Sequence, residues 1–105
     1  MEDACEGADV VYAKNYVALD LLPPVTQKPE LDEMVKLFGK YKNWIADEKR
    51  MNMAKPDAQY MHCLPCERNA EVTNEVLDGK WGLACYNEAE NRLHAQKGVM
   101  ACIIP

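Results

Sequence analysis

Three short apolar segments, separated by stretches with helical periodicity, constrain this sequence more than any other feature. They cover residues 9–13, 58–64 and 81–86. Short apolar runs of this kind are typical of buried strands, and their alternation with helices is typical of a parallel α/β sheet. With 105 residues the chain forms at most one domain. We therefore expect an α/β fold in which a parallel sheet is flanked by helices.

Helices are expected between and after these segments. Residues 31–41 place apolar side chains at helical spacing with charged residues between them. A short helix is predicted to begin at Asp47, whose carboxylate can cap it, and to end before Pro56. A third helix is predicted to follow Thr73, which would cap its N-terminus, and to end at Gly79.

The last helix is predicted from a capping pattern and one apolar face. Asn87 and Glu90 have the spacing of a capping box. The residues expected on one face of this helix are Ala89, Leu93, Gln96, Met100 and Ile103.

Composition excludes several classes of protein. The sequence has no serine and only five scattered glycines, which excludes a serine nucleophile and a glycine-rich phosphate loop. A net charge of −5 and the lack of a basic stripe argue against nucleic acid as a partner. Apolar runs such as 10–13 are too short to span a membrane, and the N-terminal residues are acidic. We therefore expect no membrane partner and a cytoplasmic location.

The cysteines are expected to be reduced thiols. Five is an odd number, and their spacing lacks the regularity of a secreted disulfide scaffold. Cys63 and Cys66 form a CxxC pattern, which could be a redox pair or half of a zinc site. A zinc site needs two further ligands at a suitable spacing, and the sequence offers neither a second CxxC nor paired histidines. Two buried thiols at a strand end are the favoured interpretation.

Residues 62–66 follow the second predicted strand, and Arg92 lies about one turn into the last predicted helix. Ligands of open parallel sheets bind outside the carboxyl ends of the strands, so polar groups there are candidate site residues. An arginine near the start of a helix can hold an anion or a polarised carbonyl. The alternative is a surface arginine paired with Glu88.

Several motifs together resemble the C-terminal part of the ornithine carbamoyltransferase family, over nearly the whole chain. They are Met-His-Cys-Leu-Pro at 61–65, Arg68, Glu-Val-Thr at 71–73, Asn-Glu-Val-Leu-Asp-Gly at 74–79 and Asn-Glu-Ala-Glu-Asn-Arg-Leu-His-Ala-Gln-Lys at 87–97. The segments 13–16 and 41–51 are more similar to the N-acetylornithine and N-succinylornithine carbamoyltransferases. Those relatives have a trefoil knot around a proline-rich loop, which implies a knot at residues 22–29 here; a surface linker is the alternative.

The resemblance implies a three-layer, partial Rossmann-like ornithine-binding domain. Residues 1–105 would form the C-terminal portion of that domain, with the carbamoyl phosphate domain absent. The reaction implied is transfer of a carbamoyl group from carbamoyl phosphate to the amine of ornithine or of an N-acylated ornithine. No cofactor and no metal are implied.

The resemblance also implies roles for five residues. Arg92 matches the arginine that reaches the carbamoyl oxygen, and Cys63 and Leu64 match positions that line the carbamoyl and amine groups, the thiol being a contact and not a nucleophile. Lys14 matches a lysine that binds the N-acylated substrate, with a solvated strand-end lysine as the alternative. His62 belongs to the motif, or is a hydrogen-bonded strand histidine.

Two positions leave the acyl group of the substrate open. Glu71 stands where the N-acetylornithine enzymes have a lysine, and it follows the pattern of the ordinary ornithine enzymes. Glu67 stands where the acylated-ornithine enzymes have an arginine, and an acid there disfavours an anionic substrate tail.

The family's phosphate-binding Ser-x-Arg-Thr-type motif has no counterpart in this sequence. We therefore expect a fragment or minimal knotted core of a carbamoyltransferase that is inactive alone. A non-catalytic knotted structural or interaction module, such as a homo-oligomer that covers the sheet edge, is the alternative. A redox pair at Cys63 and Cys66 is a third.

Overall fold

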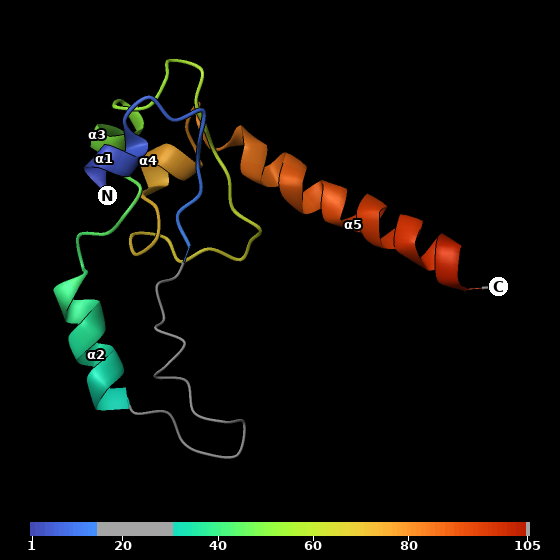
Figure 1. Ribbon diagram of the computed structural model, residues 1–105, viewed down its shortest axis with the longest axis horizontal. Coiled ribbons are helices and arrows are strands. Elements are labelled where there is room, and N and C mark those ends of the chain that lie inside the picture. The colour runs from blue at the N-terminus through green and yellow to red at the C-terminus, as the bar shows by residue number, and fades with distance from the viewer. Residues whose placement is uncertain (15–30, 105) are drawn as a thin grey trace.

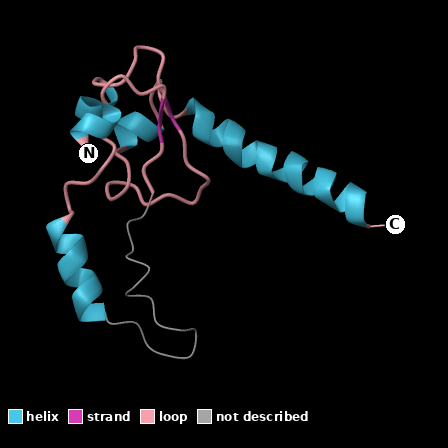
Figure 2. Ribbon diagram, in the orientation of Figure 1, coloured by secondary structure: helices cyan, strands magenta, loops and turns pink. Residues whose placement is uncertain are grey.

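The computed structural model describes residues 1–14 and 31–104 of the chain, as a small body with one long helix extending from it (Figure 1). The elements in order are α1 Glu2–Cys5, β1 Val10–Val11, α2 Leu31–Lys40, α3 Glu48–Met51, β2 Gln59–Tyr60, α4 Asn74–Leu77 and α5 Leu83–Ile103. The short helices α1, α3 and α4 lie together on one side of the strands, whereas α2 lies apart from them (Figures 1 and 2).

The two strands form a parallel pair, as the alternation of segments predicts. Val10 pairs with Gln59 and Val11 with Tyr60. The backbone N–H of Gln59 donates to the carbonyl of Asp9 at 3.0 Å, and that of Met61 donates to the carbonyl of Val11 at 3.0 Å. Both strands are shorter than the predicted segments 9–13 and 58–64, and each is followed by irregular chain that carries candidate site residues. A parallel sheet with helices is thus confirmed.

The third predicted strand, residues 81–86, is wrong. Trp81 and Gly82 form a turn, and α5 begins at Leu83. The segment contacts β2 without pairing as a strand: the Trp81 carbonyl accepts a hydrogen bond from the Tyr60 N–H at 2.9 Å, and the Cys85 thiol donates to the Tyr60 carbonyl at 3.2 Å. A Cβ on Gly82 would lie 1.8 Å from the carbonyl oxygen of Leu77, so only glycine fits this turn. A short apolar run does not distinguish a buried strand from the buried start of a helix.

The predicted caps of the two short helices are confirmed. The Asp47 carboxylate accepts a hydrogen bond from the Arg50 N–H at 2.9 Å at the start of α3. The Thr73 hydroxyl accepts one from the Val76 N–H at 3.4 Å at the start of α4. These side chains satisfy backbone donors that the first turn of a helix leaves unpaired.

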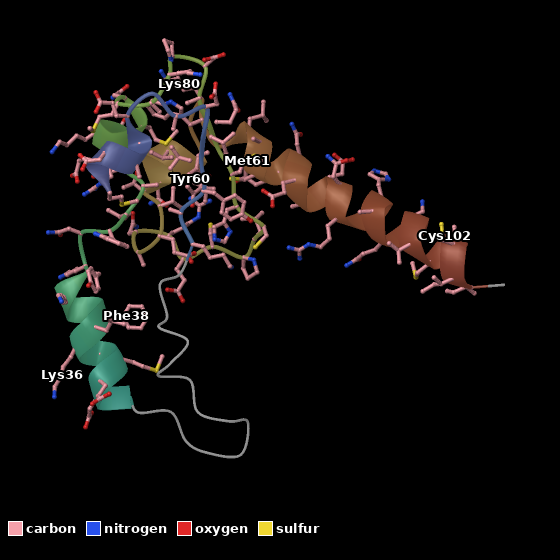
Figure 3. The ribbon with its side chains drawn as sticks, in the orientation of Figure 1. Lys36, Phe38, Tyr60, Met61, Lys80 and Cys102 are labelled. Carbon is pink, nitrogen blue, oxygen red and sulfur yellow. The ribbon has the colours of Figure 1, made fainter. Side chains whose placement is uncertain are left out.

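The predicted start of the last helix is wrong. Gly82 is the N-cap of α5, so Asn87 lies inside the helix and forms no capping box with Glu90. Cys85 is the buried anchor of α5, and every residue from Glu90 to Ile104 is exposed. The predicted apolar face therefore faces solvent, and Cys102 lies near the far end of the helix, away from the body (Figure 3).

The core lies between the sheet and the short helices. Tyr60, on β2, is fully buried and points into this body (Figure 3). The buried hydrophobic residues are Cys5, Val11, Ala46, Met51, Ala58, Tyr60, Val72, Val76, Leu77, Trp81 and Cys85. The sheet of the described residues has two strands, so a complete three-layer, Rossmann-like arrangement stays a prediction. The proline-rich loop at 22–29 lies outside the described residues, and the knot stays a prediction with it.

Candidate functional site

The segment that follows β2 is held from behind by two buried polar side chains. His62 is fully buried, and its Nδ1 accepts a hydrogen bond from the Leu64 N–H at 2.9 Å. Its Nε2 lies 3.3 Å from Oε2 of Glu71, which is 4% exposed. The same Oε2 accepts a hydrogen bond from the Glu67 N–H at 2.7 Å. His62 and Glu71 therefore fix the course of the chain from residue 62 to residue 67.

Leu64 turns this segment toward α5. Its φ of 47° lies in the left-handed region, which is uncommon for a side chain of this type and is held by surrounding contacts where it occurs. Arg92, on α5, donates from Nη2 to the carbonyl oxygens of Cys63 and Leu64, the latter at 3.3 Å. A guanidinium carries five N–H donors, so this arginine can bind a further acceptor beside the two carbonyls.

The thiol of Cys63 lies among polar side chains from two other elements. Lys14, just after β1, donates from Nζ to Sγ of Cys63 at 3.6 Å. The pKa of Cys63 is lowered, first by a hydrogen bond from Tyr12 and then by the charges of Lys14 and Arg92. This thiol consequently has more thiolate character than an ordinary cysteine at neutral pH.

The other thiols differ from Cys63. Burial raises the pKa of Cys66, and it raises that of Cys85 to about 11. All five cysteines are free. Within residues 1–14 and 31–104, no group of three or more His, Cys, Asp or Glu side chains could hold a metal ion.

An open hollow of about 440 Å³ lies beside β1 and is mostly apolar. It is lined by Met1, Ala4, Cys5, Val10, Val11, Tyr12, Ala13, Lys14 and Trp44. Lys14 thus borders both this hollow and the Cys63 thiol. None of the described helices is long and apolar enough to cross a bilayer.

Sequence reasoning missed two residues of this cluster. Tyr12 donates its hydroxyl to Oε1 of Glu88 at 3.1 Å and stacks on the His62 ring, with centroids 6.0 Å apart and an interplanar angle of 18°. The sequence suggested Glu88 only as a surface partner of Arg92, and the structure gives both residues other partners. Tyr12 and Glu88 are 76 positions apart, so no local pattern links them.

Comparison with known families gives one match over nearly the whole chain. Residues 1–103 match the model described as the Asp/Orn-binding domain of aspartate/ornithine carbamoyltransferase. The chain is 40% identical over 102 residues to an ornithine carbamoyltransferase from Hyperthermus butylicus, covering 97% of this chain and 29% of the relative. It is 43% identical over 98 residues to one from Methanococcus aeolicus, covering 93% and 29%.

Solved structures resemble the chain in the same way. Acetylornithine transcarbamylase complexed with acetylcitrulline superposes with a TM-score of 0.83 at 35% identity, covering 99% of this chain and 29% of that one. Ornithine carbamoyltransferase from Pyrococcus furiosus gives a TM-score of 0.74 at 32% identity, covering 95% and 29%. The chain therefore spans about three-tenths of the length of these relatives.

Proposed function

This chain belongs to the aspartate/ornithine carbamoyltransferase family, and from that premise we propose that it is the amino-acid-binding part of a carbamoyltransferase. The reaction would move the carbamoyl group of carbamoyl phosphate to the amine of ornithine or of an N-acylated ornithine. The relatives are named ornithine carbamoyltransferases, and one solved acetylornithine relative carries carbamyl phosphate with N-succinyl-L-norvaline. A cytoplasmic location belongs to the same proposal.

The convergence of Arg92 on the Cys63 and Leu64 carbonyls carries this proposal. Attack of an amine on the carbamoyl carbon develops negative charge on the carbamoyl oxygen, and a donor already in position stabilises it. In our assignment Arg92 supplies that donor. Removing one such donor costs about 3 kcal/mol of activation free energy.

The remaining site residues take binding roles. The Cys63 and Leu64 carbonyls accept from the substrate amine and orient its lone pair toward the carbamoyl carbon. Lys14, beside the Cys63 thiol, binds the α-carboxylate or acyl oxygen of the amino acid. His62 is buried behind this segment and holds the Leu64 N–H, so it acts on the substrate through the backbone.

We also propose that the chain alone does not turn over. It spans about 29% of the first relatives, and its sequence contains no serine for the phosphate-binding motif of the family. The proposal thus assigns residues 1–105 to the C-terminal portion of the ornithine-binding domain, with phosphate binding supplied by a separate carbamoyl phosphate domain.

Ligand binding by the purified chain tests the assignment. L-ornithine and N-acetyl-L-ornithine are titrated separately while the backbone amide NMR signals of Cys63, Leu64 and Lys14 are followed. We expect saturable shifts with one of them and their loss in Arg92→Ala. Lys97→Ala removes an exposed positive charge from the same helix and is the matched control. Shifts that survive Arg92→Ala, or no shifts with either amino acid, would contradict the proposal.

Turnover is measured separately. Carbamoyl phosphate is added with each amino acid, and citrulline or N-acetylcitrulline is sought by mass spectrometry. We expect no product from the chain alone. Product formation would show that phosphate binding does not require a further domain.

One observation favours a second candidate function, that of a non-catalytic interaction module. Leu93, Met100 and Ile103 on α5 are 58%, 46% and 72% exposed, and exposed apolar faces are used for association. Size-exclusion chromatography with light scattering separates the candidates. A defined homo-oligomer that binds neither amino acid would favour the module.

A further inference from the structure

Three segments that are distant in the sequence meet at the side chain of Tyr12. Tyr12 follows β1, its ring stacks on His62 after β2, and its hydroxyl donates to Glu88 on α5 at 3.1 Å. Among the described residues, Oε2 of Glu88 is buried without a hydrogen-bond partner, so Oε1 makes the hydrogen bond that orients this carboxylate.

We propose that Tyr12 is a positioning residue: its hydroxyl ties α5 to the end of β1 beside the Cys63 thiol, and so holds Arg92 over the Cys63 and Leu64 carbonyls. This inference rests on the proposed carbamoyl transfer, because it concerns the residues assigned to that reaction. Tyr12 itself makes no contact with the reacting groups in this assignment.

The position of Glu88 on α5 supports the proposal. Glu88 and Arg92 are four residues apart, so they lie one above the other on the same face of the helix. Because every residue from Glu90 to Ile104 is exposed, packing does not hold this part of α5. The rotation of α5 at Arg92 is therefore set by its first turns and by side-chain bonds such as that between Tyr12 and Glu88.

The Cys63 thiol offers a way to observe this bond. A phenol has one proton, so Tyr12 donates either to Glu88 or to Cys63. Hydrogen bonds with Cys63 and Glu88 and partial desolvation raise the pKa of Tyr12 to about 12, so the phenol keeps its proton at neutral pH. The ionised thiol draws this proton toward itself and competes with the Glu88 carboxylate for it.

The titratable and charged groups around the thiol come from each neighbouring element. Lys14 follows β1, Glu88 and Arg92 belong to α5, and His62 precedes Cys63 in its own segment. Lys14 and Arg92 favour the thiolate, and Glu88 opposes it. Substitutions at Tyr12 and at Glu88 are therefore expected to move the titration of Cys63 in opposite directions.

The experiment measures alkylation of Cys63 by iodoacetamide between about pH 6 and 10, read by peptide mass spectrometry on the purified full chain. Tyr12→Phe removes the donor, so the midpoint moves to higher pH and the rate at pH 7 falls about threefold or more. Glu88→Gln keeps an accepting oxygen but removes the charge that strengthens its hold on the phenol proton and opposes the thiolate, so the midpoint moves to lower pH. Exposed Cys102 serves as the reference thiol in the same digest.

Tyr86→Phe is the matched control. Tyr86 lies on the first turns of α5, and its hydroxyl donates to Asp78 at 3.4 Å, away from Cys63. The substitution removes a similar phenol hydroxyl, from the helix that carries Glu88, and we expect the wild-type midpoint for Cys63. A Tyr12→Phe midpoint equal to that of Tyr86→Phe would overturn the proposal, and so would a shift of Glu88→Gln in the same direction as Tyr12→Phe.

The outcome is independent of the proposed reaction, because alkylation requires no carbamoyl substrate. Suppose that Tyr12→Phe and Glu88→Gln move the Cys63 midpoint in opposite directions, but the chain binds neither amino acid. That result would support the role of Tyr12 and refute the proposed function. If the chain binds one of the amino acids and Tyr12→Phe has the same Cys63 midpoint as Tyr86→Phe, only the role of Tyr12 is refuted.

Discussion

Replacing Glu71 tests whether buried polar groups hold the candidate site in place. Glu71 is 4% exposed, and its Oε2 accepts from the Glu67 N–H and faces Nε2 of the fully buried His62. Glu71→Ala leaves the Glu67 N–H without its acceptor and removes the carboxylate beside His62 Nε2, which itself makes no hydrogen bond to the described residues. A polar group left unpaired in a buried setting costs about 1–3 kcal/mol, so the loss of this one hydrogen bond predicts a fall of about 2 kcal/mol in the free energy of unfolding.

Two further variants separate the hydrogen bonds from other effects. Glu71→Gln keeps an oxygen that accepts from the Glu67 N–H and loses only the charge, so we expect a loss of about 1 kcal/mol. Glu75→Ala removes an exposed carboxylate from α4 nearby, and we expect a change within about 0.5 kcal/mol.

The measurement is urea unfolding followed by circular dichroism. With a slope of about 1.5 kcal/mol per molar urea, Glu71→Ala lowers the midpoint by about 1.3 M. The reasoning is refuted if Glu71→Ala is no less stable than Glu75→Ala. It is also refuted if Glu71→Gln costs as much as Glu71→Ala, since the oxygen would then not be holding the segment.

Two other predictions concern stability. Asp47→Ala removes both the cap of α3 and one of the two carboxylates that pair with the buried Arg50, the other being Glu2, so it lowers the free energy of unfolding by about 2 kcal/mol. The same urea series, with exposed Lys49→Ala as control, would show equal midpoints if this were wrong. Burial raises the pKa of Cys85 to about 11 from 9.0, so as pH rises the unfolded chain releases this proton first and stability falls between about pH 9 and 11. Cys85→Ala should reduce that slope, and an unchanged slope would count against burial as its cause.

Local signals in the sequence located much of the fold. Asp47 and Thr73 cap helices because a cap depends on only three or four neighbouring residues. The segments around Val11 and Tyr60 are strands because their apolar side chains face a common core. Such features are predictable because the residues that determine them are adjacent in the chain.

The errors arose where the outcome depends on contacts distant in the sequence. The apolar segment 81–86 had the composition of a strand, yet it contributes one carbonyl to the sheet and then begins α5. The close approach of Gly82 to Leu77 decides this turn, and no period in the segment encodes that approach. For the same reason α5 begins at Leu83 and not at the predicted Asn87.

The candidate site was predictable only in part. Cys63, Leu64 and Arg92 were selected from motifs that resemble a family, and the structure brings them together, while their roles in binding stay predictions. The contact between Tyr12 and Glu88 was missed because it joins the ends of two elements that no spacing rule connects.

Because Arg92 lies well along α5, its position is sensitive to small changes at the N-terminal end of that helix. Arg92 lies nine residues beyond Leu83, or about 13 Å along the axis. A tilt of the helix by about 5° at Leu83 displaces Arg92 by about 1 Å over this distance. A misplacement of that size costs an active site about a hundredfold in rate. Substitutions beneath the first turn of α5 should therefore change substrate handling even where they leave every group in the site intact.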